Sequence, residues 1–309
     1  MKILITGAGG MVGRNLIADP RRAGHDILAP SRAEVDLTQA ADTTAFIDRH
    51  QPDLIINAAG LVGGIQANMA ANARFLAENL AIGLNVLTAA ARSGVPRLIN
   101  LGSSCMYPKD LDGALTEDRL LSAPLEPTNE GYALAKIVAC KLTTGLGREG
   151  GGRTWRTLIP CNLYGPFDHY EPSRSHMVAA ALAKVERAAL DDATTVEIWG
   201  DGQARREFLF AGDLADFIWR FHDRLADLPE VMNVGVGEDV AINDYYRACA
   251  DAVGYRGGFS HDLTRPVGMR RKLLDVSAQS KLGWRPPTPL AAGLLATVAD
   301  LRRQYPNGA

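Results

Sequence analysis

The sequence predicts an α/β protein built on a doubly wound parallel sheet, with a smaller mixed lobe after it. Two observations lead to this fold class. Short apolar runs alternate with helical segments through the first half of the chain, and a glycine-rich turn follows the first run directly. Strands that alternate with helices form a parallel sheet covered on both faces, and right-handed crossovers give it the Rossmann-type winding.

The expected elements follow one another closely through the first half. The run Lys-Ile-Leu-Ile-Thr at residues 2–6 is apolar enough for a buried strand, and the glycine turn leads into a helix at 11–22. Similar short runs predict strands at 26–29, 53–57, 97–101 and 156–159. The longer segments between them predict helices at 38–50, 68–92 and 132–146.

The rhythm changes after about residue 165. Helices now dominate, and short strands and turns rich in proline and glycine connect them. These helices are expected at 175–190, 212–225, 242–253 and 289–303. We therefore expect one lobe at 1–165, to which some later segments return, and a second lobe at 166–309.

Composition excludes several classes of protein. The formal net charge of -2 gives no basic surface for nucleic acid, and no apolar run of about 18 residues predicts a membrane span. The first residues lack the pattern of a signal peptide. The four cysteines show no CxxC spacing, so neither a zinc site nor a disulfide framework is expected, and a reducing cytoplasm is the simplest location.

A glycine turn follows the first strand. Gly7, Gly10 and Gly13 have the spacing G-x-x-G-x-x-G and lead into the first helix. Glycine permits the tight turn and lets the backbone approach a pyrophosphate, and the helix N-terminus offers free N–H groups. The alternative is a purely structural turn, but the strand–turn–helix context indicates a dinucleotide-binding site.

The segment after the second strand normally selects the cofactor. An acidic residue there binds the ribose 2′-hydroxyl, whereas arginine accommodates a 2′-phosphate. Here Ser31 and Arg32 follow the strand and favour NADP(H), the alternative being a solvated surface arginine. The segment Asn-Ala-Ala-Gly at residues 57–60, at the end of the third strand, is expected to pass close to the cofactor.

Tyr132 and Lys136 form a Y-x-x-x-K pair on one face of a helix. A phenol with a pKa near 10 is a poor acid or base at neutral pH, and a nearby ammonium favours the phenolate. Ser103 and Ser104 end the preceding strand, where a hydroxyl group can bind a substrate carbonyl. Together with the glycine turn, these residues resemble the extended short-chain dehydrogenases/reductases.

A closer resemblance runs nearly from end to end of the chain, to the GDP-L-fucose synthase subfamily. Its members are NADPH-dependent 3,5-epimerase/4-reductases of GDP-4-keto-6-deoxymannose. The segments that carry this resemblance are GMVG at 10–13, VGGI-x-AN at 62–68, LGSSC-x-YPK at 101–109, LEPTNE-x-YA-x-AKI at 125–137, NLYGP at 162–166, S-x-SH from Ser173 to His176, WG-x-G at 199–202, REFL at 206–209 and RKLLDV at 271–276.

The resemblance implies a role for each matching position. Ser103, Tyr132 and Lys136 would carry out the reduction at C4, and Cys105 and His176 would be the acid–base pair that inverts C3 and C5. On the residues alone, the alternative for Cys105 is a small core residue. The residues implied on the nucleotide-sugar side are Ser104, Asn162, Leu163, Lys184, Trp199, Arg206 and Lys272, although Trp199 also suits a packed aromatic.

The cofactor would be contacted by the glycine turn and by residues at the ends of strands. The expected set is Gly7, Gly10, Met11, Val12, Gly13, Ser31, Arg32, Asn57, Ala58, Ala59, Leu101, Gly102, Lys136, Pro160, Asn162, Leu163 and His176. Residues 1–165 would then bind NADP(H) and residues 166–309 the GDP-sugar. The superfamily also implies a homodimer, with helices 68–92 and 132–146 of each subunit forming a four-helix interface.

Several positions depart from the family pattern. The glycine turn lacks the arginine that the family often has before Gly10, and Pro30 stands where a second basic residue is common. Leu61, Phe210 and Val267 replace a lysine, a histidine and an aspartate. These departures bear on the cofactor and on the sugar more than on the class of reaction.

Other functions remain open on this sequence. A close variant acts on a related GDP-4-keto-6-deoxy sugar, such as a heptose or a colitose precursor, and another is a pure C4-reductase. A non-catalytic NADP-binding regulator usually loses the tyrosine or lysine that this chain keeps. A nucleotide-sugar 4-epimerase is a further option, as is a 4,6-dehydratase, which needs an acidic residue where Ser104 and Cys105 stand here.

Overall fold

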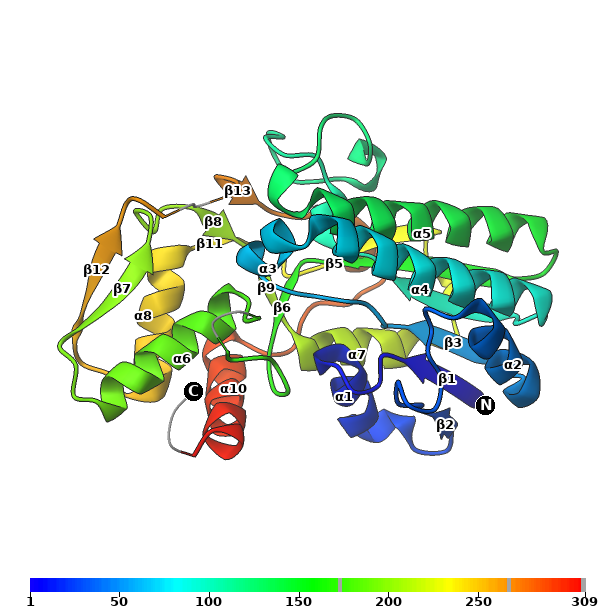
Figure 1. Ribbon diagram of the computed structural model, residues 1–309, viewed down its shortest axis with the longest axis horizontal. Coiled ribbons are helices and arrows are strands. Elements are labelled where there is room, and N and C mark those ends of the chain that lie inside the picture. The colour runs from blue at the N-terminus through cyan, green and yellow to red at the C-terminus, as the bar shows by residue number, and fades with distance from the viewer. Residues whose placement is uncertain (172–173, 266–267, 307–309) are drawn as a thin grey trace.

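The computed structural model describes residues 1–171, 174–265 and 268–306 (Figure 1). Ser173 and Val267, which were named above, lie outside the described residues. Within the described residues, six parallel strands form the central sheet in the order β10-β5-β4-β3-β1-β2. The predicted fold class, a Rossmann-type doubly wound parallel sheet with a smaller C-terminal lobe, is confirmed.

The strands fall into one large sheet and three small ones. The central sheet contains β1 Lys2–Thr6, β2 Asp26–Leu28, β3 Leu54–Asn57, β4 Arg97–Leu101, β5 Thr154–Pro160 and β10 Val231–Val234. The small sheets pair β6 Asn162–Tyr164 with β9 Phe208–Phe210, β7 Thr195–Trp199 with β12 Gly258–Asp262, and β8 Arg205–Arg206 with β11 Val240–Ala241 and β13 Arg271–Lys272.

Helices cover both faces of the central sheet and build most of the second lobe (Figure 1). Their bounds are α1 Met11–Ala18, α2 Ala40–His50, α3 Ile65–Ala70, α4 Asn72–Arg92, α5 Glu130–Glu149, α6 Met177–Leu190, α7 Ala211–Phe221, α8 Ile242–Val253, α9 Ser277–Lys281 and α10 Leu290–Gln304. None of them, within the described ranges, is long and apolar enough to cross a membrane.

Alternation along the strands decides which helices cover which face. In β1, Ile3 and Ile5 pack in a cluster with α1 and α7, whereas Leu4 packs with α2, α4 and α5. In β3, Ile56 packs in the cluster with α1 and α7, and Ile55 packs with α2, α4 and α5. Successive side chains of a strand point to opposite faces, so an apolar run without polar gaps suits a sheet covered on both sides.

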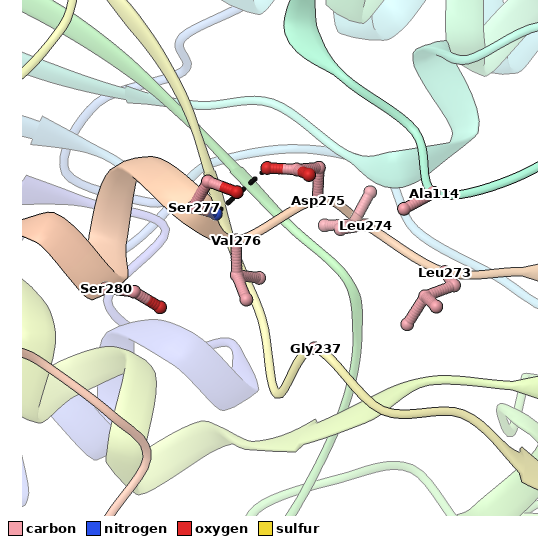
Figure 2. A pocket seen from close by; sticks show the side chains of 8 residues that line it. All are labelled: Ala114, Gly237, Leu273, Leu274, Asp275, Val276, Ser277 and Ser280. Atoms are coloured by element: carbon pink, nitrogen blue, oxygen red, sulfur yellow. Dashed lines mark hydrogen bonds between the residues drawn. The ribbon is translucent and has the colours of Figure 1, made fainter.

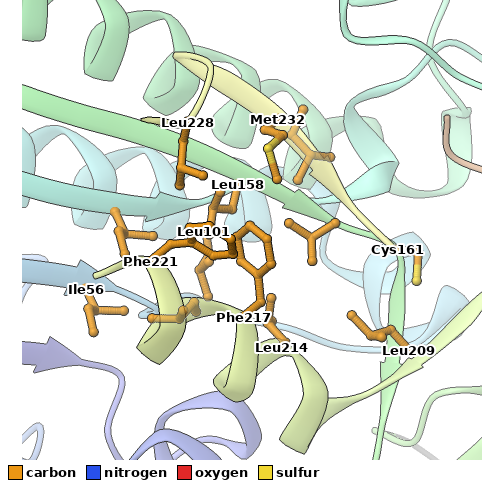
Figure 3. Close-up of a cluster of buried hydrophobic side chains, with 14 of the residues drawn as sticks. Ile56, Leu101, Leu158, Cys161, Leu209, Leu214, Phe217, Phe221, Leu228 and Met232 are labelled. Atoms are coloured by element: carbon orange, nitrogen blue, oxygen red, sulfur yellow. The ribbon is translucent and has the colours of Figure 1, made fainter. Parts of the chain in front are cut away.

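The cluster on the α7 side joins segments that are far apart in the chain. Figure 3 shows Leu101 and Leu158 of the sheet against Phe217 and Phe221 of α7, with Met232 of β10 beside them. Both β10 and α7 come after residue 165, yet they complete the first lobe. The second lobe has its own core, formed mainly by α6, α8, α10 and β7.

Two predicted helices differ in the structure, one in its end and one in its continuity. The helix predicted at 11–22 stops at Ala18, because Pro20 follows and Asp19 takes extended backbone angles. The helix predicted at 68–92 begins at Ile65 but breaks at Ala71, whose φ and ψ of −144° and 37° are not helical. The amide of Asn68 donates to the carbonyl groups of Gly63 and Gly64, just before α3 begins.

Candidate active site

The glycine turn after β1 is built for close packing and for an anion. Gly7 has a φ of 68°, and a Cβ there would lie 2.7 Å from the carbonyl oxygen of Ala58. A Cβ on Gly13 would lie 2.3 Å from the carbonyl oxygen of Gly7. Gly10 caps α1 without a side-chain hydrogen bond, and a Cβ on Gly9 would meet nothing within 4 Å. This open cradle at the N-terminus of α1 fits a dinucleotide pyrophosphate.

A buried polar ladder joins the ends of three strands beside this turn. The hydroxyl group of Thr6 donates to Oδ1 of Asn57 at 2.7 Å, and Nδ2 of Asn57 donates to Oδ1 of Asn100 at 2.9 Å. The side chain of Asn57 is therefore used within the sheet. The ladder holds the carboxyl ends of β1, β3 and β4 in register at the point where ligands bind to open parallel sheets.

The segment after β2 contains a carboxylate side chain, that of Glu34, which was not expected to take part. Glu34 accepts hydrogen bonds from the backbone N–H and the hydroxyl group of Ser31, at 2.7 and 2.8 Å. These bonds lower the pKa of the Glu34 carboxyl group. Arg32 lies exposed beside them. A carboxylate thus occupies the donors of Ser31 that a 2′-phosphate would use.

The Y-x-x-x-K pair lies on α5, next to the end of β4. Nζ of Lys136 donates to the carbonyl oxygen of Leu101 at 2.9 Å and lies 5.9 Å from the centre of the Tyr132 ring. Lys136 is only 8% exposed, and burial lowers its pKa to about 8. Burial raises the pKa of Tyr132, against the opposite effect of a hydrogen bond with Ser103. The net shift of the Tyr132 pKa is upward because burial dominates it.

Cys105 lies on the 3₁₀ turn Ser104–Met106, directly after Ser103. Its backbone N–H donates to the hydroxyl oxygen of Ser103 at 3.2 Å. Its sulfur accepts from Nδ2 of Asn129 at 3.2 Å and from Nζ of Lys272 at 3.7 Å. Cys105 also influences the pKa of Tyr132, so the thiol and the phenol are neighbours.

His176 is the residue that precedes α6. Its pKa is lowered by burial and, further, by His169 and Lys272. The positive charge of Lys272 therefore acts on His176 while its ammonium group contacts Cys105. The structure brings Ser103, Tyr132 and Cys105 together, with Lys272 at the sulfur.

A second cluster of expected residues surrounds Trp199. Nζ of Lys184 lies 5.2 Å from the centre of the indole ring, and the guanidinium group of Arg265 lies 5.1 Å from it. Lys184 also donates to the backbone carbonyl of Glu197 at 3.0 Å. Arg265 was not expected at this place. Two cations against one partly exposed indole suit an anionic ligand that carries an aromatic base.

The other expected residues are either half-buried or buried. Nδ2 of Asn162 donates to the backbone of Glu207 at 3.0 Å, and burial lowers the pKa of the half-buried Arg206. Ser104 is 1% exposed, so its hydroxyl group does not line an open surface. Met11, Val12, Leu163 and Lys272 are half-buried, and Leu101, Gly102 and Pro160 are buried at the ends of β4 and β5.

Three polar residues of this region were not identified from the sequence. Asn79 of α4 bonds both the N–H and the carbonyl of Leu61, at 2.8 and 3.0 Å. Glu207 is 1% exposed and accepts N–H groups from Val236, Gly237 and Leu274. The third, Asn129, belongs to the quoted segment LEPTNE, and that membership was the available signal.

A surface depression lies around the start of α9 (Figure 2). None of the side chains expected to act in catalysis lines it. Asp275 lies there and accepts the N–H of Ser277 at 2.9 Å, which caps α9. Its lining is formed by Ala114, Gly237, Leu273, Leu274, Asp275, Val276, Ser277 and Ser280. Among the described residues, no group of histidine, cysteine or acidic side chains has the arrangement of a metal site.

The fold and the site define a Rossmann-fold oxidoreductase of the tyrosine–lysine type. Residues 3–235 match the NAD dependent epimerase/dehydratase family. Because this match covers more than half of the chain, the protein belongs to that family and is an enzyme that depends on a nicotinamide cofactor.

Two named relatives and one solved structure are similar to the chain over nearly its whole length. The chain is 48% identical to the GDP-L-colitose synthase of Yersinia pseudotuberculosis, over 96% of each chain. It is 47% identical to the GDP-L-fucose synthase of Azorhizobium caulinodans, over 96% of this chain and 95% of the other. A GDP-D-glycero-L-gluco-heptose synthase from Campylobacter jejuni, solved in the presence of NADPH, has a TM-score of 0.88 and 27% identity, with coverage of 96% and 97%.

Proposed function

We propose that this enzyme is an NADPH-dependent 3,5-epimerase/4-reductase of a GDP-4-keto-6-deoxy-hexose that makes GDP-L-fucose or a close relative. The observation that carries the proposal is the position of Cys105, a thiol with two polar N–H partners beside Tyr132 and Ser103. A simple reductase needs only the tyrosine, the lysine and the serine. The relatives named GDP-L-fucose and GDP-L-colitose synthase support a GDP-sugar as the substrate.

In this proposal Cys105 and His176 carry out the epimerisation. A ketone at C4 acidifies the hydrogens on C3 and C5, and inversion needs a base on one face of the ring and an acid on the other. Cys105 stands on the turn after β4, and His176 precedes α6 in the other lobe. The sugar ring would bind between them, and each proton would leave to one of the two groups and return from the other.

Ser103, Tyr132 and Lys136 carry out the reduction. Tyr132 protonates O4, and the hydroxyl group of Ser103 stabilises the charge that develops on that oxygen. Because burial raises the pKa of Tyr132, the phenol carries its proton at neutral pH but is a weaker acid than a free tyrosine. Lys136 holds its ammonium group beside the tyrosine ring by donating to Leu101.

NADP(H) is the proposed cofactor, and when bound it supplies the hydride for C4. The glycine turn and the N-terminus of α1 would hold its pyrophosphate, and Ser31 and Arg32 its 2′-phosphate. The similar heptose synthase from Campylobacter jejuni was solved in the presence of NADPH, which supports NADP(H) as the cofactor. The carboxylate of Glu34 opposes this choice of cofactor, because it already accepts the hydroxyl group of Ser31 that would donate to a 2′-phosphate.

We propose that residues 1–165 bind NADP(H) and that residues 166–309 bind the GDP-sugar. Trp199, Lys184 and Arg206 would hold the base and the diphosphate. We also propose a homodimer that pairs α4 and α5 of the two subunits. Leu84 on α4 and Val138 on α5 are both 45% exposed, which is unusual for large apolar side chains in the middle of long helices.

A related sugar is the second candidate. The chain is 48% identical to the colitose synthase and 47% identical to the fucose synthase, and a similar solved structure is named as a heptose synthase. A pure C4-reductase that keeps Cys105 and His176 without inverting either carbon belongs to the same group of candidates.

The direct experiment mixes the purified enzyme with GDP-4-keto-6-deoxymannose and follows the oxidation of NADPH, with NADH in parallel. Oxidation that yields GDP-L-fucose, identified by NMR, supports the reaction, the sugar and the cofactor together. Equal rates with NADH would show that Ser31 and Arg32 do not select NADPH. No oxidation with either cofactor, in protein shown to bind NADPH, contradicts the fucose assignment and favours a heptose or 3-deoxy sugar.

A further inference from the structure

Glu207 has no role in the reaction as described so far, although it belongs to the segment REFL and follows Arg206 directly. Its buried carboxylate holds three backbone N–H groups. Oε1 accepts those of Val236 and Gly237 at 2.6 and 2.8 Å, and Oε2 accepts that of Leu274 at 2.9 Å. Hydrogen bonds to an ionised acceptor are among the strong ones in proteins, so this carboxylate fixes the segments that carry the donors.

The three bonds join elements that belong to different sheets. Glu207 lies between β8 and β9, Val236 and Gly237 follow β10 of the central sheet, and Leu274 follows β13. The space around the carboxylate is closed, because a Cβ on Gly235 would lie 2.3 Å from Oε1. The glutamate therefore ties β13, a strand of two residues, both to β8 and to the central sheet.

The strand β13 carries Lys272, which is the register partner of Arg206 on β8. Side chains at paired positions of neighbouring strands lie on the same face of a sheet, so these two cations are neighbours. The other paired positions of the two strands, Arg205 and Arg271, share the carboxylate of Asp239. Because like charges repel, Arg206 and Lys272 stay side by side only where the backbone holds the two strands in register.

We propose that Glu207 is a positioning residue that holds β13 against β8 and so fixes Lys272 beside Arg206 to bind the phosphates of the substrate. Arginine binds phosphate oxygens bidentately and lysine binds them as a point charge, so the two side chains suit a diphosphate. Glu207 acts on the ligand only through the strand that it holds. This inference rests on the proposed function, since that function makes a nucleoside diphosphate the ligand.

Calorimetric binding of GDP to the enzyme, with NADPH in parallel, tests the inference. Glu207→Gln keeps the size of the side chain, but its amide nitrogen cannot accept an N–H group, so at least one of the three bonds is lost. We expect the dissociation constant of GDP to rise about tenfold and that of NADPH to stay the same. Glu207→Asp keeps the charge on a shorter side chain and should weaken GDP binding by less. This variant also serves as the test if the glutamine variant does not fold.

Glu186→Gln is the matched control for a loss of stability. Glu186 on α6 is another buried glutamate of the second lobe, 5% exposed, and it pairs with Arg302 at 2.7 Å. Its replacement should lower the melting temperature and leave the affinity for GDP unchanged. A positioning role is thereby separated from a general loss of stability.

A double-mutant cycle shows whether Glu207 acts through Lys272. Lys272→Met alone should weaken GDP binding, and adding Glu207→Gln to it should change the dissociation constant by less than about twofold. Three results would each overturn the inference: a wild-type affinity for GDP in Glu207→Gln, an equal loss of NADPH affinity, and additive losses in the double variant.

The same measurements distinguish this inference from the proposed function. If the wild type binds GDP but does not turn over the proposed substrate, the proposed function fails, and a selective loss of GDP binding in Glu207→Gln still supports the positioning role. If the wild type binds neither GDP nor UDP, both are overturned.

Discussion

Burial, more than neighbouring charge, sets the pKa values of Tyr132 and Lys136. Tyr132 and Lys136 are both enclosed at the start of α5, and the pKa of the phenol rises while that of the ammonium falls. Each shift disfavours the charged form, as expected where water is excluded. The phenol of Tyr132 is therefore protonated at neutral pH.

Replacing Tyr132 by phenylalanine should separate the two reactions. The variant lacks the proton donor for O4, so we expect reduction to fall by about 10²–10⁴-fold. Exchange of the hydrogens on C3 and C5 should continue, because Cys105 keeps its partners Asn129 and Lys272. Measuring NADPH oxidation and deuterium uptake in the same sample checks this. Loss of both activities in a folded variant would contradict the separate roles.

Lys136 should make stability depend on pH. Its pKa falls from 10.5 to about 8 on folding, so the unfolded chain binds more protons between these values and stability rises with pH across that window. Below pH 8 the buried ammonium costs up to about 3 kcal/mol. We predict that Lys136→Met is more stable than the wild type at pH 7 and that the difference shrinks toward pH 10. Urea denaturation at both pH values measures it, and a constant difference would contradict the shift.

At the scale of elements, the packing of α1 on β1 depends on one glycine. A Cβ on Gly13 would lie 2.3 Å from the carbonyl oxygen of Gly7, which is backbone and cannot move aside cheaply. We predict that Gly13→Ala destabilises the protein by about 1–3 kcal/mol and weakens NADPH binding. Gly9→Ala is the matched control for stability, since its Cβ would meet nothing within 4 Å. Equal melting temperatures for the two variants would show that α1 can shift without cost.

The elements were predictable to the extent that local patterns determine them. The strands of the first half and the helix α8 follow from apolar periodicity, and the glycine turn follows from spacing. The break at Ala71 was not predictable, because no proline or glycine stands between Ile65 and Arg74 to mark it. Ser103, Tyr132 and Lys136 were identified because they share a recognisable motif.

The site as a whole required the three-dimensional structure. Cys105 and Lys272 meet although 167 positions separate them, and no periodicity or spacing indicates such a contact. Asn129 was part of a quoted segment but had no assigned role, since its amide acts only where α5 begins beside the turn of Cys105. The carboxylate of Glu34 on Ser31 was likewise not apparent from a segment that was examined for basic residues.

At the scale of the whole molecule, the core of the first lobe depends on elements that come after residue 165. Leu214, Phe217 and Phe221 of α7 cover the face of the sheet that carries Leu101 and Leu158 (Figure 3). A fragment of residues 1–165 lacks α7 and β10, and so exposes this apolar face. We predict that the fragment does not fold to a stable monomer. A cooperative thermal transition of the fragment, followed by circular dichroism, would contradict this dependence on α7 and β10.

The central claim is that one site both inverts carbon centres and reduces the ketone. Incubation with GDP-4-keto-6-deoxymannose in deuterium oxide, before any NADPH is added, tests it most directly. We predict that deuterium enters at C3 and C5, that NADPH then yields a product labelled at both positions, and that Cys105→Ser abolishes the label but leaves reduction measurable. Rapid reduction by the wild type without any label at C3 or C5 would contradict the claim and identify the enzyme as a pure C4-reductase.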